Sequence, residues 1–140
     1  MSSQTIKIII TGVLFLHGVA HIGPFLVIVG NWKDTGAWLA ARSWLFPNLS
    51  VQSAKLVGSA FWIFSLAGFV AASAAFWGIL IPGGLWRIIA LISAVVSALG
   101  ILLFLGTWPT FNTIAALSVN AAVFICLLWL KWPPQEMFGK

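Results

Sequence analysis

Acidic side chains are almost absent from this sequence of 140 residues. Asp34 and Glu136 are its only two acids, against seven lysines and arginines, which gives a formal charge of +5. The basic residues are scattered and form no stripe that could follow nucleic-acid phosphates, so we expect no nucleic-acid partner and favour anionic lipid headgroups. Neither acid lies in an apolar run, where it could orient a catalytic base. The sequence therefore favours a function other than catalysis.

Cysteine and tyrosine are scarce as well. Cys126 is the single cysteine, which excludes an internal disulfide and thiol exchange by a CxxC pair, and there is no tyrosine. Apolar residues are abundant instead: 61 % of the chain is hydrophobic, 6 % is charged and the mean hydropathy is +1.09. Soluble globular proteins do not have this composition, so we expect an integral membrane protein surrounded by a lipid bilayer.

Four stretches are long and apolar enough to cross a bilayer, which takes roughly 20 residues of helix. They cover residues 7–29, 54–78, 84–107 and 111–132, each to within a few residues. Pro82-Gly83-Gly84 and Trp108-Pro109-Thr110 separate the later spans and have the composition of tight turns. The sequence thus predicts an all-α fold: an integral membrane four-helix bundle of antiparallel, up-down spans that forms a single transmembrane domain over residues 1–140.

The one long connection, residues 30–53, is rich in tryptophan. Asp34 could cap a short helix that Pro47 ends, lying in the membrane interface between spans 1 and 2. An irregular tryptophan-rich loop is the alternative. Eight of the nine tryptophans fall into two belts, Trp77, Trp86, Trp129 and Trp132 at the end of the termini and Trp32, Trp38, Trp44 and Trp108 at the other.

The basic residues predict the orientation. An even number of spans places both termini on one side, with Lys7, Arg87, Lys131 and Lys140, against Lys33, Arg42 and Lys55 on the other. Because cytoplasmic loops carry the excess of Lys and Arg, this distribution favours cytoplasmic termini in a bacterial cytoplasmic (inner) membrane.

Two histidines stand out in the first span, in the stretch LHGVAHIGP of residues 16–24. His17 and His21 are four residues apart, so a helix places them on one face. They lie about 10 and 14 residues from the terminal end, or roughly 15 to 21 Å deep at the helical rise. The same count puts Ser65, Ser97, Ser118 and Asn120 at comparable depth. The sequence therefore predicts one polar layer near the bilayer midplane, beside a kink at Pro24 that frees the Ala20 carbonyl.

Several interpretations of the histidines stay open. Neutral imidazoles could hydrogen-bond to Ser97, Asn120 or the Ala20 carbonyl and hold the helices in register. His17 and His21 could instead form half of a zinc or copper site, although the spans offer no third histidine and no carboxylate. One of them could ligate a tetrapyrrole, haem or chlorophyll, with Ser97 and Asn120 as possible partners of the site. Quinones, lipids and other apolar ligands are further options.

The chain resembles a group of small uncharacterised bacterial membrane proteins with four spans. The resemblance rests on LFLHGVAHIG in the first span, with His-x3-His kept at His17 and His21, and on LWRIIALISAVVSALGILLF followed by TFNTIAAL in the later spans. This chain departs from the group at Asn112, where Gly is expected, and at Ala116, where Asn is expected. The resemblance implies the four-span fold and marks the two histidines, but it implies no activity.

From these patterns we expect a non-catalytic accessory or assembly subunit that packs against other membrane protein subunits. Small-residue faces on several spans motivate this expectation, since in lipid they allow helices to approach closely. The alternative is a membrane protein that binds a metal, haem or chlorophyll at the midplane through His17 and His21. A small transporter is the third hypothesis, supported by Pro24 and the polar layer.

Overall fold

A computed structural model describes residues 2–29 and 42–134 of the chain, and all regular structure within these residues is helical. The elements in chain order are α1 (Ser3–Ala20), α2 (Ile22–Val29), α3 (Val51–Phe76), the short η1 (Gly83–Leu85), α4 (Trp86–Leu103), α5 (Thr110–Phe124) and the π-helical turn η2 (Ile125–Trp129). Together they form four helices long and apolar enough to span a membrane: Ser3–Val29, Val51–Phe76, Gly83–Leu103 and Thr110–Trp129. The all-helical fold and the four predicted stretches are confirmed, with ends that differ by a few residues.

Serine side chains set the starts of two of these helices. The Oγ of Ser2 accepts the Thr5 N–H at 3.2 Å at the start of α1, and the Oγ of Ser50 accepts the Ser53 N–H at 3.1 Å at the start of α3. Each satisfies one of the backbone N–H groups that a helix start leaves without a partner. The α3 cap explains why this helix begins earlier than hydropathy alone suggests.

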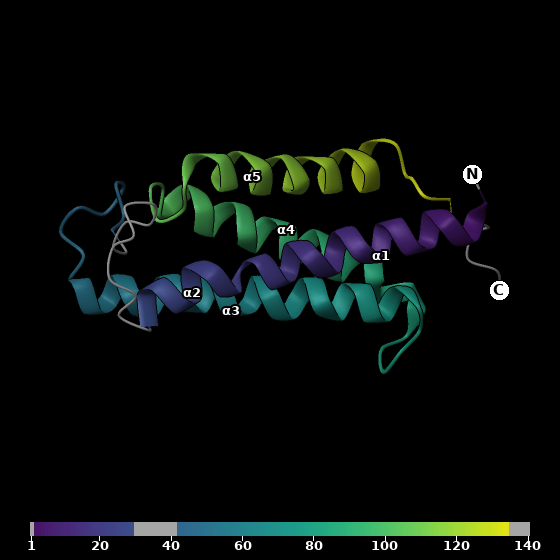
Figure 1. Ribbon diagram of the computed structural model, residues 1–140, viewed down its shortest axis with the longest axis horizontal. Helices are drawn as coiled ribbons and strands as arrows, with labels where there is room; N and C mark the ends of the chain where they lie inside the picture. The colour runs from purple at the N-terminus through teal and green to yellow at the C-terminus, as the bar shows by residue number, and fades with distance from the viewer. Residues whose placement is uncertain (1, 30–41, 135–140) are drawn as a thin grey trace.

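The helices lie side by side along the long axis of the molecule (Figure 1), and side-chain hydrogen bonds join them at both ends. At one end the Trp77 indole donates to the Thr11 hydroxyl at 2.6 Å, and the Arg87 guanidinium donates to the Pro133 carbonyl. At the other end the Trp44 indole donates to the Leu102 carbonyl at 2.6 Å. These contacts bring the first half of α1, the residues after α3, the start of α4 and the residues after η2 to one end of the molecule.

The predicted interfacial helix falls mostly outside the described residues, as do Trp32, Lys33 and Asp34. Its described part, residues 42–47, forms bends rather than helix. A long-range contact accompanies this conformation: the Trp44 indole is hydrogen-bonded to the Leu102 carbonyl in the last turn of α4, at the end of the bundle.

Helix α3 is the centre of the packing, with α1 and α2 on one flank and α4 on the other. Glycines allow the close approach. A Cβ on Gly68 would lie 2.1 Å from the Oγ of Ser93 on α4, and a Cβ on Gly18 of α1 would lie 2.9 Å from the Cβ of Phe69. The inner face of α4 carries small residues, Ala90, Ser93, Ala94 and Ser97, all buried. Small residues therefore set the α3–α4 distance, as the sequence suggests for helices in lipid.

Helix α5 is the least enclosed of the four. Only 17 % of its span is buried, against 33 to 39 % for the others. It packs mainly on α4, whereas α1 and α5 share few close contacts along their length. The seam between the first and the last helix is thus open in the part of the chain that the structure describes.

Candidate functional site

A break in the first span positions the two histidines. The helix is interrupted at His21, between α1 and α2, three residues before Pro24. Proline has no N–H to give the carbonyl four residues back, and its ring pushes that carbonyl aside, so an interruption here is the expected consequence. At the break the His21 N–H bonds to the Gly18 carbonyl at 3.0 Å, one residue short of the α-helical partner.

This local change frees the His17 carbonyl for a side chain. The Nδ1 atom of His21 lies 2.8 Å from the His17 carbonyl oxygen, so the imidazole replaces the backbone N–H that has turned away. The sequence predicted a freed carbonyl beside His21 but assigned it to Ala20. The acceptor found here is one turn earlier, at His17.

Four polar side chains from three helices complete one hydrogen-bonded cluster, which we call the midspan cluster: His17, His21, Ser97 and Asn120. The Nε2 of His21 lies 2.8 Å from the Ser97 Oγ, the Asn120 Nδ2 lies 2.9 Å from the same oxygen, and the Nε2 of His17 lies 2.9 Å from the Asn120 Oδ1. All four residues are at most 7 % exposed. Of the three partners predicted for neutral imidazoles, Ser97 and Asn120 are the ones that the structure brings to the histidines.

The direction of each bond in the midspan cluster follows from one backbone carbonyl. A carbonyl only accepts, so His21 carries its proton on Nδ1 and, as a neutral imidazole, accepts at Nε2. Ser97 must then donate its hydroxyl proton to His21 and accept from the Asn120 amide. This turns the Asn120 Oδ1 toward His17, whose Nε2 therefore donates. The two histidines have opposite tautomers, and of their four ring nitrogens only the Nδ1 of His17 has no hydrogen bond to a described residue.

Aromatic rings enclose the imidazoles. The ring of His21 lies 5.4 Å from Trp108, 6.0 Å from Trp62 and 6.1 Å from Phe69, measured between centroids. The His17 ring meets Phe69 edge-on at 4.6 Å. Trp108 is only 6 % exposed. It lies at the predicted end of the molecule, but its ring turns into the bundle against His21 instead of joining an interfacial belt, which the sequence did not predict.

Two other serines of the predicted polar layer lie apart from the midspan cluster. Ser65 of α3 is fully buried, and its Oγ has no hydrogen-bond partner among the described residues. Ser118 of α5 is exposed on the outer surface of the bundle. The sequence placed both serines in the polar layer by depth alone; Ser65 does lie inside the bundle, whereas Ser118 does not.

The geometry bears directly on the metal interpretation of His17 and His21. Their rings are 5.0 Å apart and nearly perpendicular, at 84°. Three of their four nitrogens take part in hydrogen bonds, so a shared ion would have to displace partners of His21. Within residues 2–29 and 42–134, no group of three or more His, Cys, Asp or Glu side chains could hold a metal.

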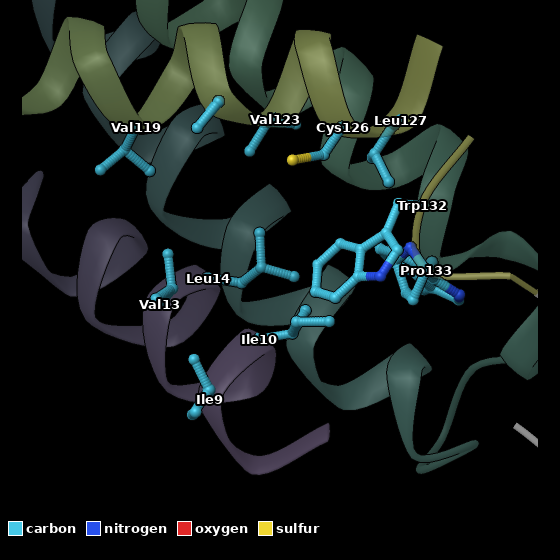
Figure 2. A pocket seen from close by; sticks show the side chains of 12 residues that line it. Ile9, Ile10, Val13, Leu14, Val119, Val123, Cys126, Leu127, Trp132 and Pro133 are labelled. Atoms are coloured by element: carbon cyan, nitrogen blue, oxygen red, sulfur yellow. The ribbon is translucent and has the colours of Figure 1, made fainter. Parts of the chain in front are cut away.

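Two cavities open along the seam between α1 and α5. One, of about 220 Å³, lies toward the end where α1 begins and is lined by apolar side chains and Cys126. Figure 2 shows α1 residues such as Leu14 and α5 residues such as Val123 on its two sides, with the Trp132 ring between them. Cys126 is half-buried in this wall.

The second cavity, of about 410 Å³, lies in the other half of the same seam. We call it the seam groove. His17 and Asn112 are polar members of its wall, and the other lining residues include Leu16, Trp108 and Ala115. The seam groove therefore brings one member of the midspan cluster to the edge of the bundle.

No known family model matches this chain, and neither a curated protein nor a solved structure matches it either. The resemblance to small four-span bacterial proteins accordingly stays a prediction, and the site stands on its own geometry.

Proposed function

We propose that this chain is a non-catalytic accessory or assembly subunit of a bacterial inner-membrane complex. In this proposal the four helices cross the bilayer in alternating directions with cytoplasmic termini, and the outer face of α5 packs against a helix of a partner protein. The proposal agrees with the midspan cluster, whose donors and acceptors are almost all used to join helices rather than offered to a substrate.

The observation that supports this proposal most is the exposed face of α5. Six residues share this face and are all exposed: Phe111, Ile114, Ser118, Ala121, Ile125 and Trp129. Large side chains occupy its two ends, and the small Ser118 and Ala121 occupy its middle. In a bilayer, small residues in the middle of a helix face allow a second helix to approach closely, and a serine at that point can hydrogen-bond across the contact. No hydrogen bond joins the Ser118 hydroxyl to a described residue of this chain, which leaves it available for a partner.

A photocrosslinking experiment in native membranes tests the proposal. A photoreactive amino acid at Ala121 should give one discrete adduct with a second membrane protein, while the same probe at Ala67 should give none. Ala67 is the matched control because it is also an exposed alanine in the middle of a long helix, but on α3. Replacing Ala121 by Leu should remove the partner from the detergent-solubilised complex, because the larger side chain occupies the space that the partner helix would use. Ala67→Leu should leave the partner bound.

The proposal fails if the chain is monomeric in native membranes, or if probes at positions 121 and 67 label the same proteins equally. A chain that crosslinks only to itself would also contradict it, since the partner would then be a second copy and not another subunit.

The cofactor hypothesis for His17 and His21 stays a second proposal with a separate test. A metal, haem or chlorophyll at these residues predicts that purified protein carries the group in stoichiometric amount. The double variant His17→Ala, His21→Ala should then insert in the membrane but lose it. A colourless, metal-free preparation from native membranes would end this hypothesis. The transporter hypothesis has no further support in the site.

A further inference from the structure

The seam groove combines a mostly apolar wall with two polar side chains, His17 and Asn112, and the His17 ring has one nitrogen that takes part in no hydrogen bond with a described residue. Its volume of about 410 Å³ lies in the range of small-molecule sites, which are typically mostly apolar with a few placed polar groups. Leu16 and Phe111 at its rim are 67 % and 80 % exposed, so the groove opens sideways, toward the lipid in the proposed orientation. A molecule dissolved in the bilayer would reach it without crossing water.

Of the two polar members of the wall, His17 is already oriented by the midspan cluster. His17 is held by its Nε2–H, which donates to Asn120 at 2.9 Å, and its ring packs against Phe69. Its Nδ1 therefore carries a lone pair and no proton. This atom can accept a hydrogen bond but cannot donate one, and that restricts the ligand more sharply than the shape of the groove does.

We propose that the seam groove binds an apolar molecule through a hydroxyl group that donates a hydrogen bond to Nδ1 of His17. A carbonyl or ether oxygen at the same place is itself an acceptor, so it would form no hydrogen bond with the lone pair of the His17 Nδ1. Among redox lipids, the groove should thus prefer a quinol, which has hydroxyl groups, to the corresponding quinone, which has carbonyls. A long-chain aliphatic alcohol offers the same donor from another source. The inference does not rest on the proposed contact with a partner subunit, although Phe111 borders both surfaces.

Binding measurements on the whole chain in lipid nanodiscs test this inference. Isothermal titration would compare three probes: a short-chain benzoquinol, its quinone, and a straight-chain alcohol. One neutral hydrogen bond corresponds to about fivefold to tenfold in affinity, so we expect the quinol to bind at least about fivefold more tightly than the quinone. The ¹⁵N signal of the His17 Nδ1 should move on addition of the bound probe, because that nucleus accepts the new bond.

Two variants separate ligand binding from folding. Ala115→Phe fills the groove from the exposed side of α5 without touching the midspan cluster, and it should abolish binding; Ala67→Phe on α3 is the matched control and should not. His17→Phe keeps a planar ring but removes the acceptor, so any residual binding should lose its preference for the quinol.

The outcomes are distinct. Preferential quinol binding that Ala115→Phe removes supports a ring hydroxyl as the donor, and equally tight binding of the alcohol supports a lipid alcohol as the source. Equal affinity for quinol and quinone would refute the assigned acceptor, and so would a preference for the quinone. Binding that survives Ala115→Phe would refute the seam groove as the site, and no binding of any probe would refute the inference as a whole.

Discussion

Asn120 is the residue whose removal tests the midspan cluster most directly. It accepts from His17 and donates to Ser97, both at 2.9 Å, and it is 1 % exposed. Asn120→Ala removes both bonds and leaves the His17 N–H without an acceptor in a region without bulk water. Hydrogen bonds between membrane helices contribute about 0.6 to 2 kcal/mol each, and an orphaned buried donor adds to the loss. We therefore expect the free energy of unfolding to fall by about 2 to 4 kcal/mol.

Reversible unfolding in mixed micelles, followed by circular dichroism, measures this loss. Asn112→Ala is the control, because Asn112 lies on the same helix, is half-buried and has no hydrogen bond to a described residue; we expect a change below about 1 kcal/mol there. A double-mutant cycle with His17→Phe should show coupling between positions 17 and 120, because the two side chains share a bond. Equal losses for Asn120→Ala and Asn112→Ala, or zero coupling, would refute the hydrogen-bonded cluster.

Three further outcomes follow from the same geometry. The ¹⁵N spectrum of the histidines should show the proton of His17 on Nε2 and that of His21 on Nδ1; matching tautomers would contradict the assigned bond directions. Gly68→Ala should destabilise the protein by about 1 to 3 kcal/mol in mixed-micelle unfolding, because the new Cβ would clash with Ser93 on α4, whereas Gly12→Ala, with no atom within 4 Å of the new Cβ, should be neutral or slightly stabilising. Pro24→Ala should let the first span continue as one helix and weaken the bond of His21 to Ser97, seen as a shifted His21 Nε2 signal; an unchanged signal would show that the break does not depend on the proline.

Hydropathy was sufficient to predict the helices, because the length of a span is set by the hydrocarbon thickness and needs no knowledge of packing. The residues at which the helices begin and end could not be predicted from hydropathy alone. The start of α3 at Val51 depends on the Ser50 cap, and the apolar run does not indicate the three residues, 51–53, that precede the expected start at residue 54. In the described part of the long connection, the helix expected from Asp34 to Pro47 failed because a single tryptophan bond holds the segment in another conformation.

Depth was also sufficient to find two of the partners of the histidines. Ser97 and Asn120 lie level with His17 and His21, and both proved to be hydrogen-bonded to them. Ser118 has almost the same depth as Asn120, yet it faces outward. Side chains two positions apart on a helix point in directions that differ by about 200° around its axis, so only one of Ser118 and Asn120 can face the bundle. Which one does so depends on how α5 turns toward α4, and one sequence gives no information about that angle.

The aromatic enclosure of His21 could not be predicted for a related reason. A tryptophan next to a turn is typical of an interfacial anchor, and Trp108 has that position in the sequence. Its ring instead packs at 5.6 Å from Trp62 and 5.4 Å from His21. The residues that could accept such a large ring, on α1 and α3, are more than 40 positions away in the chain. The seam groove depends on the same long-range arrangement, since its walls come from the first and the last helix.

The midspan cluster links a backbone feature of the first span to the chemistry at the edge of the bundle. Pro24 interrupts the helix at His21, and the interruption frees the His17 carbonyl to accept the Nδ1 proton of His21. Since that carbonyl only accepts, every later bond has one possible direction, through Ser97 on α4 and Asn120 on α5 back to the ring of His17. In water, solvent molecules could reverse such a chain at little cost, but all four side chains are at most 7 % exposed, so solvent does not supply the missing donors. Through this chain of bonds the break beside Pro24 is linked to the tautomer of His17, whose Nε2 donates and whose Nδ1 carries a lone pair.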